Sequence, residues 1–164
     1  MMTMESLSRP SAVDGAVEPL LAWLEKPLSE FMIRDPLTAD EGELVRAVRA
    51  RMIHSGAGHL PVLSGGRPVG MVTVRDLARS MPIPLTLVRR AEVARLLAMP
   101  IAQVMSTPAI TLPATATFDE AVQRMVKCNV GSIMVTDPRS GKLVGLITRS
   151  TITRAVATLS GKSA

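Results

Sequence analysis

The chain has 164 residues and a net charge of +5, with 19 Lys and Arg against 14 Asp and Glu. Hydrophobic residues make up 47% of it and charged residues 20%, which supports a packed core and excludes a wholly disordered chain. Aromatic residues are only 2%, too few for a fold that stacks nucleic-acid bases on aromatic rings. Cys128 is the single cysteine, which excludes a disulfide framework and a cysteine-based zinc site and makes a reducing cytoplasm the expected compartment.

The sequence shows no sign of membrane insertion. No apolar run approaches the ~18 residues that cross a bilayer, so we expect no membrane span. No apolar stretch follows Glu5 and Arg9, so no signal peptide is expected either. Residues 1–27 are predicted to form an extension that contains a short helix, which Trp23 anchors to the rest of the protein. Residues 161–164 are predicted to be a tail.

The decisive feature is an internal repeat between residues 28–81 and residues 101–160. A shift of 73 residues superimposes the first part of each copy, and a shift of 75 superimposes the last part, because one turn is two residues longer in the second copy. The matched pairs include Met32 with Met105, Met52 with Met125, Gly58 with Gly131, Val62 with Val135, Gly70 with Gly145 and Thr73 with Thr148. A constant offset with one insertion at a predicted turn indicates two copies of one structural unit.

Each copy predicts the same order of elements, β-α-β-β-α, because apolar residues recur first at a helical period and then in two short runs joined by a turn. The elements expected in the first copy are a strand at 37–38, a helix over 45–53, strands at 59–63 and 69–73, and a helix from near Asp76. Those expected in the second copy are a strand at 110–111, a helix over 118–126, strands at 132–136 and 143–148, and a helix from near Thr151.

Residues 82–100 are predicted to be a linker that contains a basic helix. The two repeats that it joins are about 55 to 60 residues each, too short to hold independent cores, so we expect them to pack against each other around one core. The expected fold is therefore a mixed α/β fold built from two packed repeats.

Three motifs in each copy resemble the CBS domain. The hairpin ends in Gly70–Asp76 or Gly145–Thr151, a Gly-apolar-apolar-Thr pattern that closes on Asp in the first copy only. The other two motifs are the preceding strand, at 59–62 or 132–135, and the leading segment, at 28–32 or 101–105. The resemblance implies a CBS pair, or Bateman module, with pseudo-twofold symmetry. It also implies adenine nucleotides or related adenosyl ligands in clefts between the repeats, a regulatory role without catalysis, and a flat disc-like homodimer.

The residues Thr73, Arg75 and Asp76 have the chemistry of a nucleotide grip. A strand that runs into a helix presents free N–H groups and the positive end of the helix dipole, which favour phosphate. The Asp76 carboxylate has two acceptor oxygens for a ribose diol, the Thr73 hydroxyl can donate to a phosphate, and the Arg75 guanidinium matches phosphate geometry. The same Thr-x-x-Asp spacing also fits a capping box, and the two roles can coexist.

By the resemblance, the ribose-phosphate motif of one repeat faces the adenine pocket of the other. The residues of the first site are then Val72, Thr73, Arg75, Asp76, Ser106, Thr107, Pro108, Ala109, Ile110, Val130, Gly131 and Ser132. The residues of a reciprocal, weaker site are Thr148, Arg149, Ser150, Ile33, Leu37, Ala57, Gly58 and His59. Thr151 stands where the ribose-binding Asp is expected, and its single hydroxyl cannot accept a diol in the same two-pronged way, so we predict one competent site per chain.

The resemblance also bears on the choice of ligand. Some family members carry Arg or His just before the first hairpin strand, where this chain has Gly58 and Gly131, with His59 displaced by one residue. AMP or ADP is therefore favoured over ATP as the ligand, and no further cofactor is required.

The main alternative is a nucleic-acid-associated protein that uses an arginine-rich surface. Its candidate residues are Arg46, Arg49, Arg51, Arg89, Arg90 and Arg95. An enzyme is not expected, because no nucleophile–base pair and no metal-ligand spacing is evident.

Overall fold

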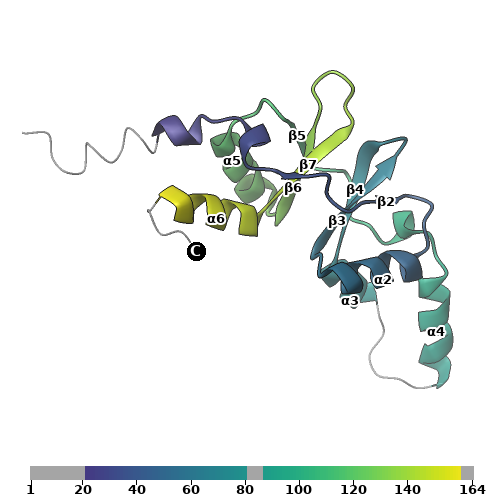
Figure 1. Cartoon of the computed structure of the whole chain (residues 1–164). Coiled ribbons are helices and arrows are strands. Elements are labelled where there is room, and N and C mark those ends of the chain that lie inside the picture. Colours follow the sequence, from purple (N-terminus) through teal and green to yellow (C-terminus); the bar gives the residue numbers. More distant parts are fainter. Residues whose placement is uncertain (1–20, 81–86, 160–164) are drawn as a thin grey trace, which may run out of the picture.

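The computed structural model describes residues 21–80 and 87–159. The start of the predicted N-terminal extension, residues 81–86 around the start of the linker, and the C-terminal tail lie outside the described residues. The described part is a mixed α/β structure in two lobes. The first lobe is built mainly from the first repeat and the second mainly from the second repeat. The linker helix α4 (Leu87–Leu97) projects from the first lobe (Figure 1).

Both repeats have the predicted order of elements, β-α-β-β-α. The first repeat consists of β2 (Ala39–Asp40), α2 (Val45–Ser55), β3 (His59–Ser64), β4 (Arg67–Thr73) and α3 (Val74–Ser80). The second consists of β5 (Thr111–Pro113), α5 (Phe118–Cys128), β6 (Ser132–Thr136), β7 (Leu143–Thr148) and α6 (Arg149–Leu159). Helices α3 and α6 begin two residues earlier than expected, because the hydroxyls of Thr73 and Thr148 accept the N–H of the third helical residue.

The helices α2 and α5 bury the faces that the helical period predicts, with two exceptions. Val45, Val48 and Met52 are buried on α2. Ile53 at the end of α2 and Val126 at the same place on α5 were expected among the apolar core positions, but they are 64% and 76% exposed. Each lies one residue after a buried methionine, and a step of one residue turns the side chain by about 100° around the helix axis.

The strands form two sheets, in the order β2-β3-β4 and β1-β7-β6-β5. In each repeat the first strand runs parallel to the second, and the second and third form an antiparallel hairpin. Both hairpins have a register shift at the matching place, between Val62 and Leu63 and between Val135 and Thr136. The repeats are therefore equivalent in backbone geometry as well as in sequence.

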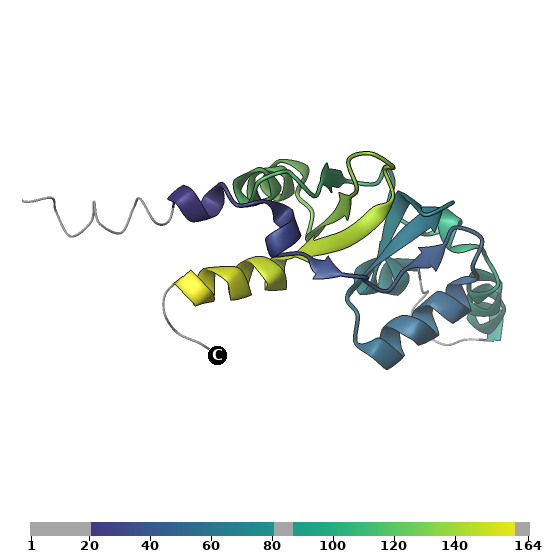
Figure 2. The same cartoon turned by 45° about the horizontal axis from the view of Figure 1, so that its top comes forward.

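The two repeats exchange their leading segments. The short helix η1 (Leu28–Glu30) begins the first repeat but packs against the second, where the Leu28 N–H donates to Ala116 O over 2.8 Å. The strand β1 (Ile33–Arg34) adds to the edge of β7, after which the chain crosses to β2 in the other lobe (Figure 2). The helix η2 (Ile101–Gln103) makes the opposite exchange, with the Ile101 N–H bonded to Glu43 O at 2.7 Å.

This exchange produces two hydrophobic clusters in place of the single core that the sequence predicts. One cluster contains the buried residues of the first repeat together with Ile101 of the second leading segment. The other contains those of the second repeat together with Leu28. The expectation of one core was wrong, because each small repeat completes its own cluster with apolar side chains borrowed from the other repeat.

Glycine is required where the exchanged segments cross the hairpins. A Cβ on Gly70 would lie 2.5 Å from Met105 Sδ and 2.9 Å from the carbonyl oxygen of Ser106. A Cβ on Gly145 would lie within 3.0 Å of the Met32 side chain, the matching contact in the other lobe. In each lobe, the glycine of one repeat thus contacts the methionine of the other repeat.

The aromatic side chains of Trp23, Phe31 and Phe118 form one cluster. The Trp23 ring centroid lies 4.3 Å from that of Phe118 and 4.9 Å from that of Phe31, in edge-on geometries that aromatic pairs favour. Residues 21–24 are helical, so Trp23 anchors this helical segment to the second lobe, as the sequence predicts.

The contact at Gly70 can be tested by substitution. We expect Gly70→Ala to lower the free energy of unfolding by about 1 to 3 kcal/mol, because the added Cβ pushes against backbone as well as side chain. Gly42→Ala is the matched control, since a Cβ there meets nothing within 4 Å. Thermal unfolding measures both, and equal melting temperatures for the two variants would contradict the proposed close packing.

Candidate functional site

A cleft of about 600 Å³ lies between the two repeats. It receives side chains from β4 and α3 of the first repeat, from the segment before β5, and from the loop between α5 and β6. The residues expected at the first site that line it are Thr73, Arg75, Asp76, Ser106, Thr107, Pro108, Ile110, Val130, Gly131 and Ser132. The fold therefore brings together most of a residue set that spans both repeats.

Two residues of the expected first site do not line the cleft. Val72 is fully buried in the first hydrophobic cluster, because alternate residues of β4 point to opposite faces of the sheet. Ala109 lies beside lining residues but is not itself in the lining. The backbone around both residues still shapes the cleft, but their side chains do not face it.

Asp76 forms a capping box with Thr73 at the start of α3. The Thr73 N–H and hydroxyl both donate to Asp76 Oδ2, over 2.9 and 2.7 Å, and the Asp76 N–H donates to Thr73 Oγ1 over 3.1 Å. The other carboxylate oxygen, Oδ1, accepts a long hydrogen bond of 3.4 Å from the Ser106 hydroxyl. One oxygen of Asp76 thus holds the helix, and the other faces the segment from the second repeat.

The exchange of leading segments places Ser106 opposite Asp76. The backbones of Ser106 and Met71 form a two-way bridge, with N–H to O distances of 3.0 and 2.8 Å. This bridge continues the edge of the β3–β4 hairpin with the chain that leads into the second repeat. The acceptor on α3 and the segment expected to contact adenine are therefore held on adjacent backbones.

The second repeat keeps the cap but not the carboxylate. The Thr148 N–H donates to Thr151 Oγ1 over 3.3 Å, the Thr151 N–H donates to Thr148 Oγ1 over 3.2 Å, and the two hydroxyls lie 3.0 Å apart. Thr151 is buried, and its hydroxyl is engaged within the cap. A threonine therefore supplies the helix start that Asp76 supplies in the first repeat, without a free acceptor oxygen.

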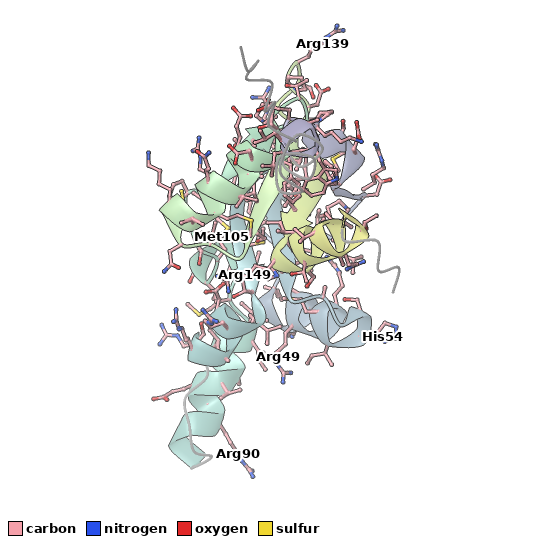
Figure 3. The ribbon with its side chains drawn as sticks, turned by 90° about the vertical axis from the view of Figure 1, so that its left-hand side faces the viewer. Arg49, His54, Arg90, Met105, Arg139 and Arg149 are labelled. Carbon is pink, nitrogen blue, oxygen red and sulfur yellow. The ribbon has the colours of Figure 1, made fainter. Side chains whose placement is uncertain are left out.

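Three residues that the sequence analysis assigned to the weaker site also line the cleft at Asp76. These residues are Gly58, His59 and Arg149. Gly58 directly precedes β3 and His59 begins it, and Arg149, which Figure 3 shows in the middle of the molecule, is the first residue of α6. Thr148, Ser150, Ile33, Leu37 and Ala57 are not among its lining residues.

The charge of the cleft is strongly positive. Arg75, Arg79 and Arg149 line it, and the carboxylate of Asp76 is the single acidic group among the described lining residues. In the described part of the chain, none of the three guanidinium groups is in a salt bridge. A cleft with unpaired arginines and one carboxylate attracts an anionic ligand that also carries hydroxyl donors.

His59 lies half-buried in the wall of this cleft. Burial lowers the pKa of His59 below its ordinary value of 6.5, and the positive charges of Arg149 and Arg75 lower it further against the opposing charge of Asp76. The imidazole is thus held neutral by its surroundings. A phosphate group in the cleft would counteract the field of the arginines and raise the pKa of His59.

Sequence reasoning missed several lining residues. These residues are Met71, Val74, Arg79, Cys128, Asn129 and Met134. Arg79 carried a usable signal, because it follows Arg75 by four residues and the two lie on the same face of α3. Cys128 and Asn129 carried none. They reach the cleft only because α5 ends beside it at Cys128, where Asn129 caps the helix with a φ of 50°.

A second groove, of about 430 Å³, lies between α2 and α3. Its lining is largely aliphatic and includes Met52, the exposed Ile53, and Leu77. Val74 contributes to this groove and to the main cleft, so the two hollows share a wall.

Three of the arginines considered as a nucleic-acid surface, Arg49, Arg51 and Arg90, can be placed individually in the described part of the chain. Arg51 is held by Glu43 at 2.6 Å and by the carbonyl oxygen of Thr38. Figure 3 shows Arg49 and Arg90 pointing outward at separate places, and the side chain of Arg89 lies outside the described residues. Within the described ranges, no group of three or more His, Cys, Asp or Glu is arranged to hold a metal ion, and no helix is long and apolar enough to span a membrane.

Comparisons with known proteins agree with this architecture. The CBS domain model matches residues 28–83 and 101–158, so the chain belongs to the CBS domain family as a tandem pair. It is 28% identical over 137 residues to the uncharacterized protein MJ1404 of Methanocaldococcus jannaschii, a match that covers 80% of this chain and 32% of that protein. The chain spans less than half the length of this and two other curated relatives that it matches.

Two solved structures with bound ligands share the fold. The structure of CBSX2 in complex with AMP has a TM-score of 0.68 at 17% identity, covering 82% of this chain and 98% of that one. The CBS domain pair of protein MJ0100, in complex with 5-methylthioadenosine and S-adenosyl-L-methionine, has a TM-score of 0.65 at 22% identity, covering 81% and 97%. At such low identity, the likeness establishes the fold.

The position of His59 makes a prediction about pH. The pKa of His59 is lower in the folded protein than its ordinary value of 6.5. As the pH falls below 6.5, His59 therefore binds a proton in the unfolded chain before it does so in the folded protein. The stability that the neutral imidazole contributes is therefore present above pH 6.5 and is lost as the pH falls from there toward the folded pKa. We expect wild type to lose stability over this range relative to His59→Gln, as measured by urea unfolding at several pH values.

His54→Gln is the matched control, because His54 lies exposed on α2 and points outward in Figure 3. If wild type and His59→Gln show parallel stability profiles across this pH range, His59 is not held neutral by the cleft.

Proposed function

We propose that this CBS pair is a regulatory module that binds an adenosine nucleotide, AMP or ADP in preference to ATP, in the cleft between its repeats. The observation that carries the proposal is the cleft itself, where the Asp76 carboxylate and three arginines converge with a segment of the other repeat. CBSX2, which shares the fold, was solved with AMP, and the MJ0100 pair with two other adenosyl compounds.

The ligand would be divided among three kinds of surface. Asp76 Oδ1, which the capping box leaves available, would accept the ribose hydroxyls. Apolar side chains of the lining, including Met71, Ile110 and Val130, would cover the faces of the adenine. The arginines would bind the phosphate. Gly58 and Gly131 carry no cationic side chain of their own at the positions where some family members use one to hold longer phosphate chains.

A ligand bound in this cleft would report on metabolic state through the contact between the lobes. It touches both repeats, so it favours the relative arrangement of the lobes that closes around it, and a partner that contacts both lobes would sense the difference. No catalytic group is assigned in this proposal. We place the module in the cytoplasm, where a chain with one cysteine is stable in its reduced form.

We further propose that the partner includes a second copy of the chain. Ile53 on α2 and Val126 on α5 occupy equivalent positions of the two repeats, and both are exposed aliphatic side chains. The groove beside Ile53 is lined mainly by apolar residues. Exposed aliphatic side chains at equivalent positions of the two repeats suit an isologous contact, because a second copy brings the same pair of residues.

The ligand proposal is tested with AMP and ADP. We expect both to raise the melting temperature of wild type by mass action, and Asp76→Thr to lose most of that rise. Threonine is chosen because the pair Thr148 and Thr151 shows that a hydroxyl maintains the same cap. The unliganded variant should therefore stay folded with a melting temperature close to that of wild type.

Asp76→Ala is the companion variant. It should lose both the ligand effect and about 1 kcal/mol of stability, because Thr73 loses its hydrogen bonds to the Asp76 carboxylate. If AMP raises the melting temperature of Asp76→Thr as much as that of wild type, Asp76 does not contribute to the binding site. A wild type that responds to no adenosyl compound would overturn the proposed function.

The dimer proposal is tested by analytical ultracentrifugation. We expect wild type to sediment at twice the chain mass of 17.5 kDa, and the double variant Ile53→Glu, Val126→Glu to sediment at the chain mass. Arg46→Glu, another exposed position on α2, is the control and should remain dimeric. A wild type that is monomeric at ~50 μM, well above the protein concentrations at which stable homodimers form, would contradict the proposal.

A further inference from the structure

The symmetry between the two repeats breaks at the first three residues of the closing helices. At a shift of 75 residues, Val74, Arg75 and Asp76 of α3 correspond to Arg149, Ser150 and Thr151 of α6. The backbone does not share this break. The Val74 N–H donates to Gly58 O over 3.3 Å, and the Arg149 N–H donates to Gly131 O over 3.2 Å. The difference between the helix starts therefore lies in side chains alone.

The break places the charged groups of both helices in one cleft. The α3 helix contributes Asp76 with two arginines, and α6 contributes Arg149 from the opposite lobe. A Cβ built on Gly131 would lie 3.0 Å from His59 Nε2 and 3.8 Å from Arg149 Nε. The side chains of Arg149 and His59 thus both lie close to Gly131, which belongs to the second repeat.

Among the described residues, the Arg149 guanidinium has no ion-pair partner. It is exposed, and the salt bridges of the described residues involve other arginines and lysines only. The valine at the equivalent position of the first repeat shows that the fold does not need a cation there. A guanidinium that lines a cleft, unpaired and dispensable for folding, is well placed for a ligand anion.

We infer that Arg149 determines the specificity of the Asp76 site, by selecting phosphorylated adenosines over uncharged or cationic adenosyl compounds. This inference rests on the proposed function and deepens it. Arg75 and Arg79 lie on the same helix as Asp76, in the first repeat. Arg149 approaches from the other lobe, so that a phosphate bound by all three arginines links α3 to α6.

The physical reason for this selectivity is the balance of charge in the cleft. Three positive charges face one carboxylate, whose Oδ2 is already engaged by Thr73. A phosphate dianion is favoured by this excess of positive charge, whereas a sulfonium such as that of S-adenosylmethionine is repelled by it. An uncharged ligand such as methylthioadenosine or adenosine gains nothing from the arginines.

The test compares ligands that differ only in the phosphate. Isothermal titration calorimetry with AMP and with adenosine is carried out on wild type and on Arg149→Val, which gives the second repeat the residue that the first one has. We expect the variant to bind AMP roughly tenfold to hundredfold more weakly, the typical contribution of a hydrogen bond to a charged group. Adenosine should bind both proteins within about twofold of each other, since it makes no phosphate contact.

Two further variants sharpen the result. Arg154→Val changes another exposed arginine on α6, outside the cleft lining, and should leave both affinities unchanged. Arg149→Lys keeps the charge but loses the forked geometry, so its affinity for AMP should lie between those of wild type and Arg149→Val.

The possible failures are distinguishable. If AMP and adenosine weaken equally in Arg149→Val, or if wild type binds AMP no more tightly than adenosine, the inference about Arg149 is wrong while the proposed adenosyl site stands. If wild type binds neither AMP nor adenosine, the proposed function fails and the inference fails with it.

Discussion

The structure depends on the exchange of leading segments between the repeats. A unit of this size buries too little apolar surface to be stable alone, and each one here is completed by a short helix and an extended segment from the other. The glycines at 70 and 145 permit the crossing, since any side chain there would meet the methionine of the opposite segment. The same crossing brings Ser106 to the backbone of Met71, beside Asp76. The cleft is therefore a consequence of how the two cores are completed.

Within that frame, the Thr-x-x-Asp motif serves the fold and the proposed site with the same side chain. A carboxylate can do this because it has two oxygens, of which the helix cap uses one. The second repeat shows what happens when only the structural role is kept, because Thr151 closes an equivalent cap and leaves no acceptor toward a ligand. In the first repeat, the motif can therefore cap the helix and contact a ligand. In the second repeat, it only caps the helix.

The two repeats differ in sequence at the starts of α3 and α6, and this difference determines how charge is distributed in the cleft. Two equal sites would each have held one carboxylate and a share of the cations. In this chain, the residues at 74–76 and 149–151 differ, and the cations from both helices face a single carboxylate. Burial and the nearby arginines keep His59 neutral by lowering its pKa, which makes this imidazole sensitive to the arrival of an anion. The proposed preference for phosphorylated ligands follows from this concentration of charge.

The order of elements and the hairpins followed from the sequence, because hydrophobic period and turn residues are local properties that recur in both repeats. Thr73, Arg75 and Asp76 were proposed from their own chemistry, whereas the other expected residues of the first site followed from the resemblance to the CBS domain. The tertiary structure alone decided which core each leading segment completes, and it placed Arg149, His59 and Gly58 at the Asp76 cleft. Their positions depend on contacts between residues far apart in the chain, such as that of Gly70 with Met105. Sequence periodicity carries no information about which lobe a crossing segment enters, since both lobes offer an equivalent surface.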